Sequence, residues 1–245
     1  MNIQPYKTHK IQPNEDLFTI LDKYLPQLEE KGIVALASKI VGICEGRVVK
    51  KISPEQKEKL IKEEADYYLP QPRMGYLMTI YHKMLVVNAG IDESNSNGFL
   101  SFWPKDPQKS TNAIREYLCK KHDLKNLGVI LTDSKVSPLR RGVTGYALAH
   151  SGFKALNSYI GKKDIYGEKM HVEQSNIADS LATAAVLNMG EGNEQQPLAV
   201  ITDVPFVNFE SKNPTQKELD LLKIKLEDDM YSSMLTAVKW KRGEK

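Results

Sequence analysis

Carboxylate side chains follow apolar runs at three places in the chain, and these residues are the first candidates for chemistry. The three clusters are Asp92-Glu93-Ser94-Asn95, Thr132-Asp133-Ser134 and Glu191-Gly192-Asn193-Glu194. Hard cations such as Mg²⁺ and Mn²⁺ prefer oxygen ligands, and Mg²⁺ commonly adds substrate phosphates and water. Each cluster alone is also typical of a turn, because Asp, Asn and Gly hydrogen-bond their own backbone and tolerate unusual backbone angles. Three clusters in one chain shift the balance toward a shared cation site without deciding it.

The third cluster lies in the sequence MGEGNEQQ at residues 189–196, which could also hold an anion. Gly190 and Gly192 would let backbone N–H groups approach a phosphate closely. The alternative is a helix end, with Gly190 as the C-terminal cap and an ordinary loop behind it. The residues alone slightly favour the helix end.

Other reactive side chains give weaker indications. Arg140 and Arg141 follow the Asp133 cluster and could bind a carboxylate or phosphate through two hydrogen bonds, although an exposed surface pair is commoner. The five histidines show no metal-ligand spacing. Cys44 and Cys119 lie far apart, so neither a disulfide framework nor a thiolate metal site is expected. The P-loop, dinucleotide-binding and nucleophile-elbow motifs are all missing.

The elements that must position the clusters follow from apolar patterning. Residues 76–87 predict a strand before the first cluster, and 126–131 predict a strand that stops at Thr132. Residues 175–189 predict a helix that ends at Gly190, and a further strand is expected after Pro197. The first and second clusters are thus expected directly after strands, and the third directly after a helix.

The remaining segments indicate the fold class. Ser53 and Gln56 form a capping box for a polar helix, and Thr215 with Glu218 forms another for a final amphipathic helix. Residues 106–124 have helical spacing, and 32–49 predict a strand, a polar break at Ser38-Lys39 and a second apolar stretch. Helices and strands do not alternate regularly, and several connections are too short for a crossover. The prediction is an α+β fold with mixed, largely antiparallel sheets and packed helices.

Composition limits the class of protein. With 245 residues, 41% hydrophobic and 27% charged, the chain can bury a sizeable core. The net charge of +3 is too small to indicate a nucleic-acid partner. The N-terminus lacks a signal peptide and no apolar run is long enough to span a bilayer, so a cytoplasmic protein without a membrane partner is expected. Residues 1–245 are predicted as one unit, which could divide into two subdomains, with 213–245 as a C-terminal helix and basic tail.

Five motifs in the chain together resemble the γ-glutamyl ligases typified by coenzyme F-420:L-glutamate ligase. They are ALASKIVGICEGRVV, NAGIDESN, LTDS with PLRRG, DIYGEKM, and ADSLATAAVLNMGEGNEQQPLAVI, in the family's order between about Ile33 and Ile201. Each motif is weak alone, but the combination is specific. The resemblance implies an α+β intertwined homodimer that uses GTP, or ATP, to join L-glutamate to a carboxylate of an acceptor.

The resemblance also implies roles for particular residues. Asp92 and Asp133 match the ligands of one divalent metal, Mg²⁺ or Mn²⁺, and Ser134 and Glu191 match contacts to a second. K⁺ is a further ion that the resemblance allows. The nucleotide contacts that it implies are Ser38, Lys39, Asn95, Met189, Gly190, Glu191, Gly192, Asn193, Glu194, Gln195 and Gln196.

The implied reaction needs no covalent nucleophile on the protein. A carboxylate is a poor electrophile, so it is first converted to an acyl phosphate by the nucleotide γ-phosphate, and the amine of glutamate then attacks. Asp92 and Asp133 are the expected catalytic metal ligands, since metals neutralise the phosphate oxygens and align the transfer. Arg140 is the candidate for holding an anionic group of a substrate.

The chain departs from the family's pattern at three places. Residues 9–12 differ from the usual Pro-Leu-Ile segment, Ile43 replaces a lysine, and 136–140 read VSPLR in place of Gly-Arg-Pro-Trp-Arg. These changes concern the acceptor and the nucleotide base more than the metals. Two acceptors therefore stay open, the coenzyme F-420 precursor and tetrahydrofolate. A regulatory module that binds metal and nucleotide without catalysis is the alternative of another class.

Overall fold

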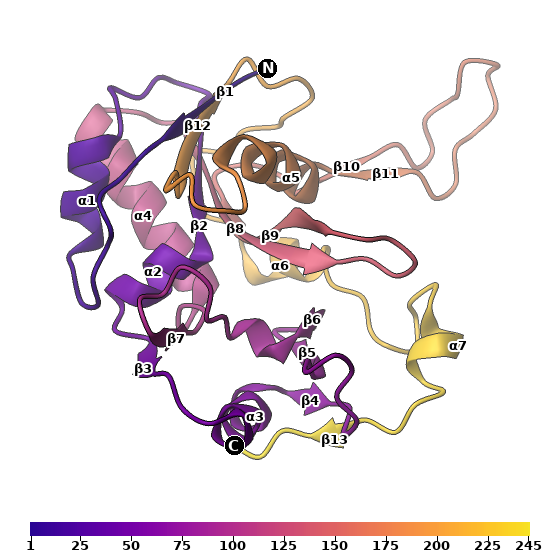
Figure 1. Ribbon diagram of the computed structural model, residues 1–245. Coiled ribbons are helices and arrows are strands. Elements are labelled where there is room, and N and C mark those ends of the chain that lie inside the picture. The colour runs from indigo at the N-terminus through magenta and orange to yellow at the C-terminus, as the bar shows by residue number, and fades with distance from the viewer.

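A five-stranded sheet forms the larger of two lobes in the computed structural model, which describes all residues 1–245. The strand order is β1-β12-β2-β8-β9, and only the β2–β8 pair is parallel (Figure 1). The strand bounds are β1 Asn2–Tyr6, β12 Leu198–Thr202, β2 Ile33–Ala37, β8 Gly128–Val136 and β9 Val143–Ser151. We call this part of the molecule the sheet lobe.

Helices cover both faces of this sheet because its central strands are apolar on both sides. Val129 and Leu131 of β8 pack with α1 (Leu17–Tyr24) and α4 (Pro107–His122) in one core. Ile130, which points to the opposite face, packs against α5 (Ile177–Met189) in a second core. The sheet is therefore a buried layer, and only the carboxyl end of β8 extends beyond it.

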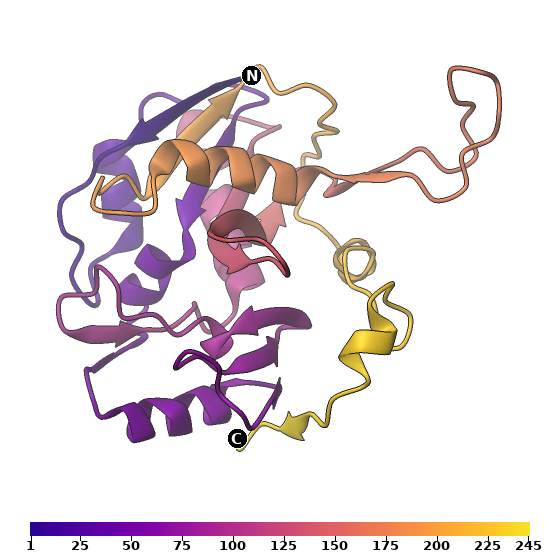
Figure 2. The ribbon, with the colours of Figure 1, turned by 45° about the vertical axis from the view of Figure 1, so that its right-hand side comes forward.

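The smaller lobe is built around a four-stranded sheet of order β13-β4-β5-β6 (Figure 2). It also contains α3, the β3–β7 pair and the short helix η1, which leads into the first acidic cluster. The bounds are β13 Lys241–Arg242, β4 Tyr67–Tyr68, β5 Met78–Tyr81, β6 Met84–Val87, α3 Pro54–Glu64, β3 Val48–Lys50, β7 Phe99–Ser101 and η1 Asn88–Gly90. Helix α2 (Ser38–Cys44) leaves β2 and lies between the lobes.

Two segments extend away from the lobes. The strands β10 (Leu156–Ser158) and β11 (Gln174–Asn176) begin an arm whose outer part, residues 159–173, projects from the molecule in both views (Figures 1 and 2). The C-terminal segment passes through α6 (Gln216–Asp220) and α7 (Ser232–Leu235) before it joins the small lobe as β13. None of the helices is long and apolar enough to cross a membrane.

The predicted α+β fold with largely antiparallel sheets is confirmed. Both capping boxes form as predicted, at Ser53 with Gln56 and at Thr215 with Glu218. Gly190 also ends α5, so the interpretation of this residue as a helix cap is confirmed.

Two predicted strands differ from the structure. Residues 76–87 form a hairpin rather than one strand, because His82 and Lys83 both adopt positive φ and make a tight turn without the usual Asn-Gly signal. The apolar stretch after Ser38, for which no element was predicted, forms the helix α2. Strand β8 does not stop at Thr132 but continues to Val136, because β9 pairs with it up to Val143.

The expected long C-terminal helix is also wrong. After the capping box only α6 forms, and apolar residues that would have made a buried stripe, Leu221 and Ile224, are exposed. A helical pattern gains most of its stability from packing its apolar face, and no part of this chain covers that face.

Candidate active site

A cavity of about 1230 Å³ collects nearly all of the predicted site residues. It is lined by parts of both lobes, and it receives side chains from β2 and α2, from the loop after η1, from β8 and from the loop after α5. The predicted residues that line it are Ser38, Lys39, Asp92, Asn95, Asp133, Ser134, Met189, Gly190, Glu191, Gly192, Asn193, Glu194, Gln195 and Gln196. Of the residues to which the sequence assigned a catalytic, nucleotide or metal role, only Arg140 lies outside the cavity.

Asp92, in the loop after η1 of the small lobe, places a carboxylate in this cavity. Lys39 donates to its Oδ2 over 2.5 Å and also to the carbonyl of Ser94 over 2.8 Å. The backbone N–H and hydroxyl of Ser94 donate to the same carboxylate over 2.9 and 2.7 Å. Although burial raises it, the charge of Lys39 and these hydrogen bonds hold the pKa of Asp92 below its ordinary value. Asp92 is thus a carboxylate with a cation already beside it.

Asp133 comes from β8 in the sheet lobe and is bound by a residue of the small lobe. The indole N–H of Trp103 donates to its Oδ2 over 2.5 Å, and the backbone N–H of Ser134 donates to Oδ1 over 2.9 Å. Burial raises the pKa of Asp133 to about 6, against the effect of both hydrogen bonds, and the nearby charge of Asp92 adds to the rise. The side chain keeps partial contact with solvent through the cavity. An added cation would relieve this unfavourable charge.

Ser134 and Glu191 form a second pair of oxygen donors. Neighbouring residues of a strand point to opposite faces, so Ser134 faces α5 while Asp133 faces Trp103. The Ser134 hydroxyl donates to Glu191 Oε1 over 2.5 Å. Because β8 runs past its parallel neighbour β2, both faces of its end are open for such contacts.

The loop 189–196 is fixed from two sides. Glu194 accepts the N–H of Gly192 over 2.8 Å, so an anionic oxygen already occupies a backbone donor of this loop. Asn95 donates to the carbonyl of Gly192 over 2.8 Å, which joins two segments predicted to contact nucleotide. Gln195 and Thr8 exchange hydrogen bonds of 2.5 and 3.1 Å. The loop therefore has a defined shape that can receive an anion.

The N-terminal segment forms another part of the cavity wall, although its residues depart from the family's pattern. His9 Nε2 lies 2.6 Å from Glu15 Oε2, and His9 Nδ1 lies 2.8 Å from the hydroxyl of Tyr24. Since the Tyr24 hydroxyl also accepts the backbone N–H of His9, these three side chains fix the path of the segment.

The donor chemistry fits a hard divalent cation. Asp92, Asp133 and Glu191 supply carboxylates and Ser134 supplies a hydroxyl, all of them oxygen donors of the kind that Mg²⁺ and Mn²⁺ prefer. No three acidic, histidine or cysteine side chains form a preassembled metal cluster. Lys39 and Ser134 instead hold two of the carboxylates, so a cation at Asp92 would compete with the Lys39 ammonium.

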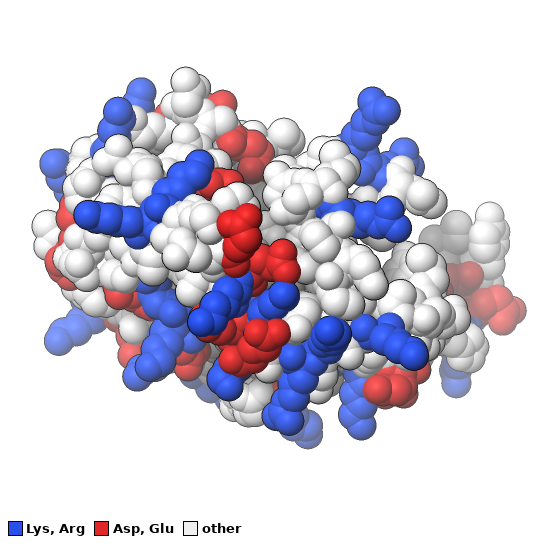
Figure 3. Space-filling model, turned by 60° about the horizontal axis from the view of Figure 1, so that its bottom comes forward, with Lys and Arg blue, Asp and Glu red and all other residues white.

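Two candidates from the sequence lie outside the cavity. Arg140 is exposed in the turn between β8 and β9, and its side chain makes no ion pair. Glu93 points away from Asp92 and pairs with Lys51 and Lys57, each at 3.1 Å. Figure 3 shows acidic side chains lying among basic ones on the face that it presents. Glu93 is therefore a surface residue beside a site residue.

Trp103 and Tyr146 are the site residues that the sequence did not indicate. Tyr146 pairs with Asp133 across β8 and β9, lines the cavity, and has a buried hydroxyl without a hydrogen-bond partner. Burial, followed by the charge of Asp133, raises its pKa well above the ordinary value, so it is protonated at neutral pH. The only sequence signal for Trp103 is Gly90, which has φ +73° and lies against the indole, where a Cβ would come within 2.2 Å of Cε2.

Comparisons with known proteins show the family to which the chain is similar. The model of the family described as F420-0:Gamma-glutamyl ligase matches residues 5–203. A coenzyme F420:L-glutamate ligase of Methanococcus maripaludis strain C7 is 35% identical over 80% of this chain and 85% of its own. The ligase of the same name from Archaeoglobus fulgidus is 30% identical over 78% of this chain and 82% of its own. The matched region contains every residue that lines the cavity.

Gly90→Ala should release Asp133 from Trp103, because the new methyl group and the indole cannot occupy the same space. We expect a shift in Trp103 fluorescence, measured in a Trp240→Phe background, together with weaker binding of Mn²⁺. Gly98→Ala is the matched control, since Gly98 has φ +81° but open space around it. Equal effects of both substitutions would show that backbone strain, rather than the indole contact, is responsible.

Asp133→Asn should change the pH dependence of stability in metal-free protein. With its pKa raised to about 6, Asp133 is protonated in folded and unfolded chains below pH 4 and charged in both above pH 6. Burial of that charge costs up to roughly 3 kcal/mol at high pH. The free energy of unfolding of Asp133→Asn, relative to that of the wild type, should therefore rise from pH 4 to pH 8. Urea unfolding in the presence of a chelator measures it. The Glu93→Gln variant should not gain stability relative to wild type over this pH range, because Lys51 and Lys57 lower the pKa of Glu93.

Proposed function

Because the chain belongs to the F420-0:gamma-glutamyl ligase family, we propose that it joins L-glutamate to a carboxylate of the coenzyme F-420 precursor and consumes GTP or ATP. The observation that carries the proposal is the convergence of four separate chain segments on one cavity. They meet through Lys39 with Asp92, Asn95 with Gly192, and Ser134 with Glu191.

The nucleotide phosphates would bind between Lys39, Asn95 and the loop 189–196. The Gly192 N–H that now binds the Glu194 carboxylate is a donor for an anionic oxygen, and Lys39 supplies positive charge close by. The wall formed by residues 8–13 would cover the nucleoside.

Divalent cations would be held by Asp92 with Asp133 and by Ser134 with Glu191. Bound there, they would supply positive charge that neutralises phosphate oxygens during transfer. Lys39 would leave the Asp92 carboxylate when a cation arrives and turn its ammonium toward the phosphates. Trp103 would keep Asp133 oriented, because its N–H holds one carboxylate oxygen.

The reaction would take place in two balanced steps. A carboxylate oxygen of the acceptor attacks the γ-phosphorus, the bond to the bridging oxygen breaks, and the nucleoside diphosphate leaves. The amine of glutamate then attacks the acyl carbon, inorganic phosphate leaves with the bonding electron pair, and the amine gives up a proton.

Activity should depend on Asp92 and Asp133. Purified protein with Mn²⁺, GTP, glutamate and either the coenzyme F-420 precursor or tetrahydrofolate should give a glutamylated product with the precursor. Asp92→Asn and Asp133→Asn should each lower kcat/KM by about 100-fold or more, since even outer-shell changes at metal sites cost 10- to 100-fold. Mass spectrometry of the products measures this.

Glu93→Gln is the matched control, because Glu93 adjoins Asp92 in the chain but lies outside the cavity. Near-normal turnover of either Asp variant would reject the metal assignment. If tetrahydrofolate is glutamylated and the coenzyme F-420 precursor is not, the acceptor is a folate. If nucleotide binds but neither acceptor is glutamylated, a regulatory module is favoured.

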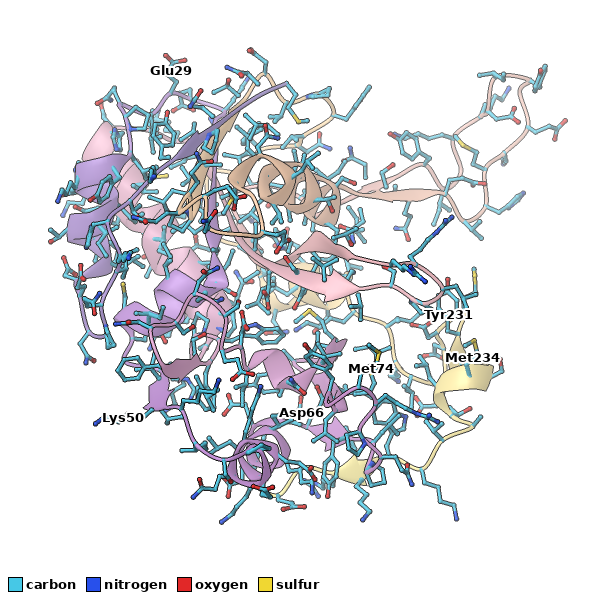
Figure 4. The ribbon with its side chains drawn as sticks, in the orientation of Figure 1. Glu29, Lys50, Asp66, Met74, Tyr231 and Met234 are labelled. Atoms are coloured by element: carbon cyan, nitrogen blue, oxygen red, sulfur yellow. The ribbon has the colours of Figure 1, made fainter.

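We also propose that two chains form an intertwined homodimer. Met74, Tyr231 and Met234 are exposed apolar residues (Figure 4), as are Ile165 and Tyr166 on the projecting arm. We propose that a second chain covers these side chains, because burial of large apolar surface from water favours association. Sedimentation equilibrium should give twice the mass of one chain, and the double variant Ile165→Asp, Tyr166→Asp should sediment as a monomer. A monomeric wild-type protein would contradict the proposal.

A further inference from the structure

The cavity has a second end that the nucleotide and metal assignments do not use. It lies between two hairpins, β5–β6 of the small lobe and β8–β9 of the sheet lobe, which face each other in Figure 1. Strands β6 and β8 come into contact here. Four apolar side chains at this end remain half exposed: Leu85 at 42%, Tyr76 at 54%, Val136 at 49% and Val143 at 46%.

Both hairpins contribute apolar side chains to this end of the cavity. Val136 and Val143 are opposite each other at the end of the β8–β9 hairpin. On the other hairpin, Met78 pairs with Val87, and Leu85 lies two residues from Val87 on the same face. All five side chains line the cavity. We call the space that these side chains border, between the two hairpins, the hairpin slot.

The charges around the hairpin slot are positive. The acidic residues that line the cavity, Asp92, Asp133, Glu191 and Glu194, belong to the end already assigned to metal and nucleotide. Arg140, in the turn that connects β8 to β9, is exposed and has no ion pair. The neighbouring Arg141 is likewise exposed. A ligand that enters between the hairpins would thus meet apolar walls and guanidinium groups at the rim.

We propose that the hairpin slot binds the planar heteroaromatic ring of the acceptor, with Arg140 and Arg141 attracting its anionic groups. The assignment rests on the proposed ligase function, which requires the acceptor carboxylate to reach Asp92 and Asp133. The nucleotide occupies the opposite end, and glutamate is small and polar, so the acceptor is the one reactant with a ring to bury. A flat ring that packs against these half-exposed apolar side chains removes its own surface and theirs from water.

The test is direct binding of the acceptor, measured by its fluorescence without glutamate or nucleotide. Leu85→Asp and Val143→Asp should each weaken binding of the coenzyme F-420 precursor by 10-fold or more, while the affinity for GDP with Mn²⁺ stays unchanged. Leu187→Asp is the matched control, because Leu187 is an equally apolar residue, 81% exposed on α5 and outside the cavity. The double variant Arg140→Ala, Arg141→Ala should bind the coenzyme F-420 precursor at least 3-fold more weakly. Its affinity for riboflavin, which is neutral, should not change.

Circular dichroism verifies folding, and Leu85→Ala with Val143→Thr replaces any Asp variant that fails to fold. Wild-type affinity in the slot variants, or an equal loss in Leu187→Asp, would overturn the proposal. So would a wild-type protein that binds neither the precursor nor tetrahydrofolate. If the wild-type protein makes no product but binds the precursor, and Leu85→Asp weakens that binding, the ligase function is rejected while the hairpin slot stands as the ring-binding site. Tighter binding of tetrahydrofolate than of the precursor would identify a pteridine as the ring.

Discussion

Two carboxylates, one from each lobe, have to coexist in one partly buried cavity, and the rest of the structure is arranged around that constraint. Asp92 arrives from the small lobe and Asp133 from the sheet lobe, and each raises the cost of the other's charge. Lys39 balances the first with an ion pair and Trp103 binds the second with its indole N–H. Both contacts cross between segments far apart in the chain, so the contacts that make the charges tolerable also join the lobes. A cation bound between the two carboxylates would balance the remaining negative charge.

The sequence was most informative where residue types and the family's motifs together named candidates for the site. The carboxylates, the glycine-rich loop and the Ser-Lys pair could be assigned from their types and from the family's motifs, and the structure collects them in one cavity. The capping boxes at Ser53 and Thr215 could be predicted because they depend on residues only three positions apart. Local rules of this kind do not require knowledge of the fold.

The sequence was least informative where a residue acts through a distant neighbour. Nothing near Trp103 in the chain indicates that its N–H meets Asp133, and the unpaired hydroxyl of Tyr146 depends on a strand register that only the fold defines. The His82-Lys83 turn carries no turn-forming residue pair, so one long strand was predicted where a hairpin exists. The apolar wall of the hairpin slot resembled ordinary strand core, because a half-exposed valine and a buried valine look alike in a sequence.

The sheets are completed by the two ends of the chain, and this has a consequence for synthesis on the ribosome. Strand β1 pairs with β12, which joins Asn2 to Thr202, and β13 pairs Arg242 with Tyr67. Strand β1 must therefore wait until β12 has been made before it has a partner. Until then the nascent protein exposes unpaired strand edges and apolar faces, the features that favour aggregation and chaperone binding. Folding of the five-stranded sheet is expected to finish only after β12 has left the ribosome.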